Sequence, residues 1–509
     1  MLTLADIFES QSQLGVGAVI GNTERVTYES YLLGCRRNIN DKTPREYYNW
    51  DRKRQYEYTD SLIVEYVRNN LKLVEGFIDS NEEVEQESLI DRLRTDIVDF
   101  GILRNALEDD TVQEIQINDF KTIFVVQGGK SSPYVDSRGN PHQFVSNDEL
   151  VSTINRLIYS QKGDTPRMTQ ANPLLNARTA NKGYRLSGVN STAITPDTVV
   201  GMDFPTTSIT LRKYSSSRLG FEDFERFGTL VPKMSKFTRL ASRADLRILC
   251  VGPTSSGKTT LLNAMAWELP EELRVILIQN PTEIMLYDRD PVTRRNRRNT
   301  LHWEAEDLPP GRAESPTSAT MANLVAHSLR NTPDVVIPGE LRTPLEFLQA
   351  NRVIKTGHRM LTSIHSYGAA GAVSRFAAEL SELGGSQADH TRSLANQLDI
   401  IYTQKKLEDG SRRVMAIEEL TGRVDPDTGL AEANILFKFT YTGEVDIDPT
   451  NPDNVLRIHG YFEQVSPISD RLIEKFYAAG ITRSILEEFI TVPAKVIGAS
   501  NLPSEGCVV

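Results

Sequence analysis

The sequence contains little cysteine, no long apolar run and no excess of positive charge. Its three cysteines, Cys35, Cys250 and Cys507, are scattered along 509 residues. This scatter excludes a disulfide framework and a paired zinc site, and it suits a reducing cytosol. No apolar run approaches the length of a membrane span, so we expect any membrane contact to come through a partner. The net charge of −11 provides no global basic field, so nucleic acid is not an expected partner, although it is not excluded.

The two ends of the chain carry no targeting pattern. MLTLADIFES has early acidic residues and lacks the basic region of a secretory signal, and the terminal GCVV does not fit a prenylation motif. We therefore expect a cytoplasmic protein, and its length suffices for two or three domains.

The most informative stretch is GPTSSGKTT at 252–260, which fits the spacing G-x-x-x-x-G-K-[ST]. The apolar run LRILCVGP precedes it, and TTLLNAMAWELP with helical spacing follows it. A strand, a glycine-rich loop and a helix in this order are the context that a nucleotide-binding P-loop requires. The sequence therefore predicts a nucleotide site here.

The expected chemistry of this loop follows from its residue types. Glycines let the backbone N–H groups point at phosphate oxygens, and the helix N-terminus adds a positive dipole end. Lys258 should reach the β- and γ-phosphates, and the Thr259 hydroxyl should hold Mg²⁺. The expected nucleotide contacts come from Gly252, Pro253, Thr254, Ser255, Ser256, Gly257, Lys258, Thr259 and Thr260.

Composition and periodicity divide the chain into five segments. We expect a helical extension at 1–87, an α+β domain at 88–213, a linker at 214–229, a larger domain at 230–422 and a small C-terminal appendage at 423–509. In the larger domain, helical patterns separate several of the short apolar runs LRILCVG, LRVILIQ, DVVIPGE, RMLTSIH, DIIYTQ and RRVMAI. Strands alternating with helices are typical of an α/β fold with a parallel sheet.

The sequence predicts local structure at two sites that contain proline. Ser466 is expected to cap the last helix, with Pro467 at its first position. Pro338 lacks the N–H that a central strand needs, so we expect a bulge or an irregularity there.

Three polar residues lie at or just beyond the ends of successive predicted strands. They are Glu283, Glu340, which is followed by Arg342, and His365. Because strand ends in such sheets face the nucleotide crevice, we expect these side chains to lie near Lys258. One carboxylate can orient Mg²⁺ while another activates water, and an imidazole can sense the γ-phosphate. We also expect Glu340 to take part in holding the Mg²⁺ ion, together with Thr259.

The order of these segments resembles a family, the type II/type IV secretion ATPases, and most closely their Tad/Flp pilus assembly branch. The resemblance covers about 88–490 and rests on linked motifs. They are EDDTVQEIQIN, IFVVQGGK, YRLSGVN, SITLRKY, FGTLVPKMSKFTRLASRADLRILCVGPTSSGKTTLLNAM with the P-loop, NLVAHSLRNTPDVVIPGELR, the histidine motif TGHRMLTSIHS, LDIIYTQKKLEDGSRRV and FYAAGI.

The resemblance implies a RecA-like ATPase domain in a hexameric ring, with ATP and Mg²⁺ bound between it and the N-terminal domain. By position, the arginines expected to close on the phosphates are Arg178, Arg185 and Arg212. On the RecA-like side, Arg330 and Arg342 match family arginines. One departure is that Gln279 and Asn280 stand where the family usually has an acidic pair, which leaves Glu283 as the remaining carboxylate of that motif.

The function expected from this resemblance is a cytoplasmic ring ATPase that powers a secretion, pilus-assembly or conjugation machine. Its expected partners are copies of itself and inner-membrane platform or secretion-machine proteins, through which it would be peripheral to the inner membrane. The alternatives are a DNA-translocating or remodelling ATPase and an ATP-binding scaffold with weak hydrolysis. The basic run RDPVTRRNRRN at 289–299 could grip DNA or a partner, but a solvated loop or a ring interface is the favoured interpretation.

Overall fold

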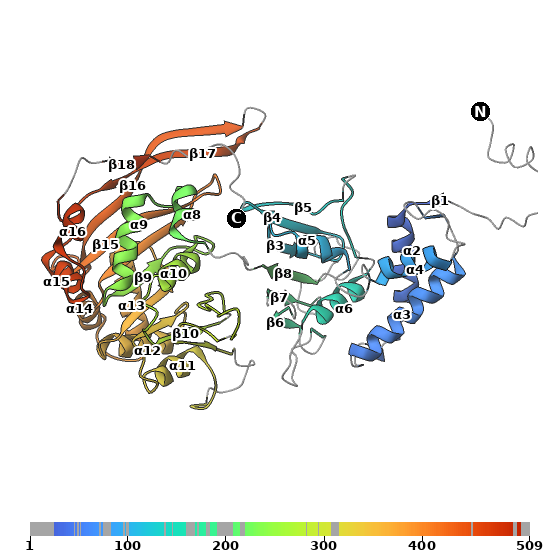
Figure 1. Cartoon of the computed structure of the whole chain (residues 1–509), viewed down its shortest axis with the longest axis horizontal. Coiled ribbons are helices and arrows are strands. Elements are labelled where there is room, and N and C mark those ends of the chain that lie inside the picture. Colours follow the sequence, from blue (N-terminus) through green and yellow to red (C-terminus); the bar gives the residue numbers. More distant parts are fainter. Residues whose placement is uncertain are drawn as a thin grey trace, which may run out of the picture. The chain divides into compact units, whose positions relative to one another are not determined.

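A computed structural model shows two compact units, residues 1–214 and 215–509, which we describe separately (Figure 1). The structure describes the following residues: 25–44, 46–47, 50, 52–70, 73–74, 83–94, 97, 101–136, 139–144, 146–158, 168–169, 173–179, 184–190, 207–213, 219–280, 282–293, 295–306, 315–448, 451–491 and 496–499. Cys507 and the ends of the chain lie outside these ranges.

The first unit begins with helices that pack on one another around a small apolar core. Its elements are β1 (Arg25–Val26), α2 (Tyr28–Lys42), α3 (Arg52–Asn69), β2 (Leu73–Val74) and α4 (Glu83–Arg94). Tyr31, Cys35, Ile63, Val67 and Leu89 are buried in this core. The expected boundary at 87 falls inside α4.

A six-stranded antiparallel sheet forms the rest of the first unit. The elements are η3 (Gly101–Leu103), α5 (Arg104–Glu108), β3 (Val112–Ile117), β4 (Ile123–Gln127), β5 (Lys130–Pro133), α6 (Asn147–Leu157), β6 (Leu174–Arg178), β7 (Arg185–Val189) and β8 (Ser208–Arg212). The strand order is β5-β4-β3-β8-β7-β6. Leu150 and Ile154 of α6 share a core with Ile115, Leu186 and Leu211 of the sheet. The expected α+β character is confirmed.

The second unit is built on one ten-stranded sheet in the order β11-β10-β12-β13-β9-β14-β15-β16-β17-β18. Its first six strands are parallel. They are β11 (Thr300–Glu304), β10 (Val275–Gln279), β12 (Val335–Pro338), β13 (Arg359–Ile364), β9 (Arg247–Val251) and β14 (Ile400–Lys406). Both faces of these strands are covered, which explains why they appear as continuous apolar runs. The predicted α/β fold with a parallel sheet is confirmed.

Helices cover both faces of this sheet. On one face, α8 (Phe221–Arg226), α9 (Pro232–Arg243), α10 (Lys258–Trp267), α15 (Asp470–Ala478) and α16 (Arg483–Ile490) share a core with Ile248 and Leu277. On the other face, α11 (Met321–Ser328), α12 (Pro344–Lys355), α13 (Gly368–Ser381) and α14 (Gln387–Gln397) pack with Leu249 and Ile276. Phe221 of α8 is 1% exposed, so the segment expected to be a linker contributes to this core.

The last four strands extend the same sheet in antiparallel fashion (Figure 1). They are β15 (Arg412–Val424), β16 (Ala431–Asp448), β17 (Asn451–Gln464) and β18 (Val496–Ala499). The interpretation of RRVMAI as a further strand of the parallel sheet is therefore wrong. Only 407–411 join β14 to β15, and a parallel crossover needs a dozen or more residues. The expected boundary at 422 falls inside β15.

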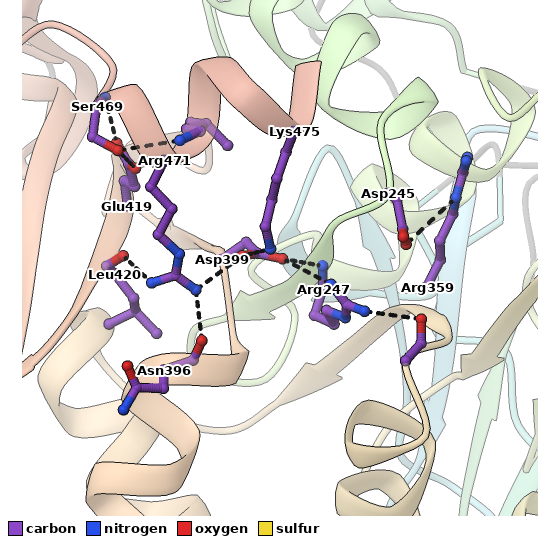
Figure 2. Close-up of polar contacts among 12 residues, drawn as sticks. Asp245, Arg247, Arg359, Asn396, Asp399, Glu419, Leu420, Ser469, Arg471 and Lys475 are labelled. Carbon is purple, nitrogen blue, oxygen red and sulfur yellow. Dashed lines mark hydrogen bonds and ion pairs between the residues drawn. The ribbon is translucent and has the colours of Figure 1, made fainter. Parts of the chain in front are cut away.

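A polar cluster at the N-terminus of α15 corrects the predicted helix cap (Figure 2). The cap is Ser469, whose hydroxyl accepts from Leu472 N, and not Ser466. The buried Glu419 of β15 explains the difference, because its carboxylate binds both the hydroxyl and the backbone N–H of Ser469. The side chains of Arg471 and Lys475 in α15 contact Asp399, whose side chain is 2% exposed. A buried charge of this kind needs such partners.

Candidate functional site

The P-loop turns sharply between β9 and α10. Gly252, Ser255 and Gly257 have positive φ angles of 152°, 61° and 97°. A side chain at Gly252 would meet the backbone oxygen of Gln404 at 2.2 Å, so the chain needs glycine there. Gly257 is the N-cap of α10, and the helix N-terminus therefore opens directly onto the loop. This geometry suits an anion.

Lys258 folds back over the loop that precedes it. Its Nζ donates to the carbonyl oxygens of Gly252 and Pro253, each at 3.0 Å, and lies 3.4 Å from Nδ1 of His365. The residue is 6% exposed, and Thr259, the next residue of α10, is half-buried. The ammonium group is thus positioned where a phosphate on the loop would need a counter-charge.

Glu340 and His365 meet beside Lys258. His365 Nε2 lies 2.6 Å from Glu340 Oε1, and His365 Nδ1 lies 3.3 Å from the carbonyl oxygen of Gly252. Arg342 donates to Glu340 Oε2 through Nε at 3.0 Å and through Nη2 at 2.7 Å. Two of the three residues predicted at strand ends are therefore brought together at the P-loop.

The electrostatics of this group keep Glu340 ionised. Burial raises the pKa of its carboxyl group, but the hydrogen bonds and charge of Arg342 and the charges of His365 and Lys258 together lower it below its ordinary value. A carboxylate at neutral pH can accept a proton or hold a metal-bound water.

The predicted irregularity at Pro338 is present. Pairing between β12 and β13 stops after Val335 with Arg359 and Val336 with Met360. Beyond it, the hydroxyl groups of Thr362 and Ser363 donate to the carbonyl oxygens of Pro338 and Gly339, at 2.6 Å and 2.8 Å. Just before Glu340, hydrogen bonds from these side chains thus replace the backbone pairing between β12 and β13. Sequence reasoning missed these two hydroxyl residues.

Gln279, the last residue of β10, binds the backbone of the loop that follows this strand. It is 2% exposed. Its Oε1 accepts from the backbone N–H groups of Glu283 and Ile284, at 2.9 Å and 2.7 Å, and its Nε2 donates to the carbonyl oxygen of Ile284 at 3.0 Å. The amide therefore shapes the loop after β10. An amide can both donate and accept, which a carboxylate cannot do.

Glu283 lies on the loop that Gln279 shapes and is half-buried. Within the described part of the chain, no hydrogen bond or ion pair joins its carboxylate to Lys258, Glu340 or His365. Its catalytic role remains a prediction from sequence.

The three arginines predicted in the N-terminal domain form one row across its sheet. Arg178 pairs with Arg185, and Arg185 pairs with Arg212, on neighbouring antiparallel strands. Glu114 lies opposite Arg212 on the fourth strand of the row. Directly opposed residues point to the same face, and like charges in that position repel each other. Glu114 places one carboxylate on the same face as this row.

The two arginines predicted on the RecA-like side occupy different places. Arg342 contacts Glu340, as described above. Arg330 is exposed and precedes β12, and its neighbour Asn331 accepts from Arg274, which precedes β10. Since the P-loop follows the carboxyl end of a parallel strand, Arg330 lies at the opposite edge from Lys258 in this subunit. A nucleotide contact from Arg330 would need a neighbouring subunit and remains a prediction.

Two arginines of the basic run at 289–299, Arg297 and Arg298, contact other residues of the second unit. Arg297 pairs with Asp288 and Asp290. Arg298 donates to the carbonyl oxygens of Trp267 and Leu269, and it lies over the Trp267 ring at 4.9 Å. These contacts give both arginines a structural role.

Strand β15 brings two further residues to the site that the sequence did not indicate. Arg412 donates from Nε to the carbonyl oxygen of Ser255 at 3.0 Å. Glu418 accepts from the backbone N–H of Ala369, just after the histidine motif. Arg412 lies in the linked segment LDIIYTQKKLEDGSRRV, but no role was predicted for it, and Glu418 lies outside the linked motifs. The places of both residues depend on the antiparallel turn at 407–411. None of the helices in the described ranges is long and apolar enough to cross a bilayer.

Comparison with known proteins places this site in a family. The chain is 27% identical over 198 residues to an uncharacterized protein of Methanocaldococcus jannaschii, covering 39% of this chain and 67% of that one. It is 25% identical over 314 residues to a probable conjugal transfer protein, TrbB, of Sinorhizobium fredii, covering 60% and 83%. Two further curated relatives, a second uncharacterized protein of Methanocaldococcus jannaschii and a twitching motility protein of Neisseria gonorrhoeae, are matched over 41% and 46% of their own length.

Among solved structures, the Legionella pneumophila ATPase DotB matches with a TM-score of 0.42 and 20% identity, covering 64% of this chain and 80% of that one. The family model for type II/IV secretion system proteins matches residues 143–429, which is more than half of the chain. The protein therefore belongs to the type II/IV secretion system protein family.

Proposed function

We propose that this protein is an ATPase that hydrolyses ATP at the P-loop and uses the energy to drive a secretion, pilus-assembly or conjugation machine. The observation that carries the proposal is the convergence of Lys258, Glu340 and His365 on the loop between β9 and α10. A counter-charge and an ionised carboxylate that can orient water are groups that phosphoryl transfer to water uses, and an imidazole beside them can sense the γ-phosphate.

Each residue has a defined part in this proposal. Phosphate oxygens would take over the contacts that Lys258 now makes with backbone carbonyl oxygens. Thr259 and Glu340 offer a hydroxyl and an ionised carboxylate, which are oxygen donors that suit Mg²⁺. When bound, the ion would neutralise charge on the phosphates. Glu340 would orient or deprotonate the attacking water, and His365 would sense the γ-phosphate.

The machine is proposed from family membership and from the names of relatives. They include a probable conjugal transfer protein and a twitching motility protein of Neisseria gonorrhoeae. From the resemblance we also propose that Arg178, Arg185 and Arg212 close on the nucleotide phosphates, as in a ring. We therefore propose ATP-promoted hexamers in the cytoplasm that dock on inner-membrane platform proteins, and we place the chain in the Tad/Flp branch on its motifs.

The test is phosphate release by the full chain with ATP and Mg²⁺, compared with Lys258→Ala. We expect the variant to keep its circular dichroism spectrum and to lose turnover, because the main phosphate counter-charge is gone. Repeating the assay with added DNA separates the alternatives. Strong stimulation by DNA would indicate a DNA-translocating enzyme, and ATP binding without turnover would indicate a scaffold. Wild-type turnover in Lys258→Ala would contradict the assigned site.

A further inference from the structure

Helix α13 starts directly after the histidine motif but does not cap itself. Its N-cap residue, Tyr367, makes no side-chain capping hydrogen bond, and its first turn contains no acidic residue. Gly368, its first residue, has a φ of +67°. The first N–H groups of a helix need acceptors from elsewhere. An acceptor from another element can therefore bind at this end of the helix.

Glu418 of β15 supplies that acceptor. Its Oε2 accepts from the backbone N–H of Ala369 at 3.0 Å and from the hydroxyl of Thr403 at 3.3 Å. The same oxygen lies 3.9 Å from where a side chain on Gly368 would begin. A carboxylate at a helix N-terminus also interacts favourably with the helix dipole. Glu418 thus joins α13 to β14 and β15.

Helix α13 in turn holds His365. Arg375, two turns into the helix, donates from Nη1 to the carbonyl oxygen of His365. The imidazole of that residue lies between Glu340 Oε1 and the carbonyl oxygen of Gly252. A shift of the helix would therefore move the backbone that carries the imidazole.

We propose that Glu418 is a positioning residue for nucleotide turnover: it fixes the N-terminus of α13 and thereby sets His365 against Glu340 and the P-loop. This inference rests on the proposed ATP hydrolysis. It adds a residue outside the nucleotide loop, on the antiparallel extension of the sheet, whose effect on the reaction passes through His365.

The neighbouring residue provides a matched control. Glu419 is the next residue of β15 and is buried where Glu418 is half-buried. Its carboxylate binds Ser469 at the N-terminus of α15 (Figure 2). Both residues thus cap a helix, and only the helix of Glu418 follows the histidine motif. A loss caused by general destabilisation should appear in Glu419→Ala as well.

The first experiment is hydrogen–deuterium exchange on the full chain without nucleotide. We expect Glu418→Ala to speed exchange in peptides covering 366–376. Glu418→Asp should do the same, because its shortened carboxylate keeps the charge but no longer reaches Ala369. Glu418→Gln should stay close to wild type, since the amide oxygen still accepts, and Glu419→Ala should leave these peptides unchanged. Unchanged exchange in the Ala and Asp variants would overturn the inference, whether or not the protein hydrolyses ATP.

The second experiment is a kinetic double-mutant cycle. We expect Glu418→Ala and Glu418→Asp to lower kcat by roughly 10- to 100-fold, as small misplacements of a reacting group do. The nucleotide Kd of these Glu418 variants should change less than about twofold, because the contacts of Glu418 are with Ala369 and Thr403 and not with the P-loop. Glu418→Gln should restore most of kcat. In a His365→Ala background the further effect should vanish. Additive losses, or an equal loss in Glu419→Ala, would overturn it. Absence of turnover in the wild type would instead refute the proposed function.

Discussion

The imidazole of His365 and the carboxylate of Glu340 form a 2.6 Å contact at the edge of the P-loop. The two residues follow the neighbouring strands β13 and β12. His365 also lies near Nζ of Lys258, and Glu340 accepts from Arg342. In the proposed function, this contact places an ionised carboxylate and an imidazole beside the loop that would bind the phosphates.

His365→Ala should lower kcat without preventing nucleotide binding. Removal of one group that interacts with the transition state typically costs about 10²–10³ in kcat. His358→Ala is the control, because that imidazole contacts Thr356 before β13 and not the P-loop. Phosphate release and fluorescent nucleotide titration measure the two quantities. A His365 variant with wild-type kcat would exclude the residue from the reaction.

Gln279→Glu should destabilise the protein. The buried amide donates to the carbonyl oxygen of Ile284, and a carboxylate would face that oxygen without a proton to donate. An unsatisfied buried group of this kind costs about 1–3 kcal/mol, or more when charged. Thermal unfolding compared with Asn280→Asp, at a half-buried position, measures this effect. Equal midpoints would mean that the loop does not depend on the amide.

Asp399→Ala should destabilise the second unit strongly. The carboxylate accepts from the backbone N–H of Arg247 at 2.9 Å and pairs with Lys475 and Arg471 (Figure 2). Loss of one partner in a buried ionic cluster costs about 3–5 kcal/mol. Asp389→Ala is the control, since it breaks an exposed pair with Arg392 that is worth about 0–1 kcal/mol. Similar denaturation curves for the two variants would contradict the buried role of Asp399.

Glu419 should make stability depend on pH. Burial raises the pKa of its carboxyl group, Ser469 and Arg471 lower it, Asp399 raises it, and the net shift is upward. Its contribution to the free energy of unfolding is therefore fully present below the pKa of the unfolded chain, about 4.3, and is lost as pH rises through the folded pKa.

Glu419→Gln removes that titration and still accepts hydrogen bonds from Ser469. Its Tm relative to wild type should rise as pH increases from about 4 to 8, because only the wild type carries a buried carboxylate. Each kcal/mol corresponds to roughly 2–4 °C in a domain of this size. A constant difference across this range would mean that the carboxyl group titrates alike in folded and unfolded chains.

Local sequence patterns predicted the part of the fold that surrounds the nucleotide loop. The apolar runs of β9, β10, β12 and β13 and the motif glycines were sufficient for it, because parallel strands place their carboxyl ends along one edge. The placement of Glu340 and His365 near Lys258 followed from that rule.

The other parts of the fold and of the site could not be predicted, because they depend on contacts between residues far apart in the sequence. The turn at 407–411 reverses the chain and brings Arg412 and Glu418 to the site, and no local pattern indicates that partnership. The helix cap is Ser469 and not the predicted Ser466 for the same reason, because Glu419, which binds Ser469, lies 50 residues earlier in the chain. From the sequence, Gln279 was recognised only as an amide in place of an acidic residue. Its hydrogen bonds to the loop after β10 became evident in the structure.

The most direct measurement is single-turnover hydrolysis of ATP by Glu340→Gln beside the wild type, with nucleotide affinity measured on the same samples. The account predicts that the variant binds ATP with near wild-type affinity and loses turnover by about 10²–10⁴, because the carboxylate that accepts the proton is gone. Wild-type turnover in Glu340→Gln, or loss of binding together with turnover, would contradict it.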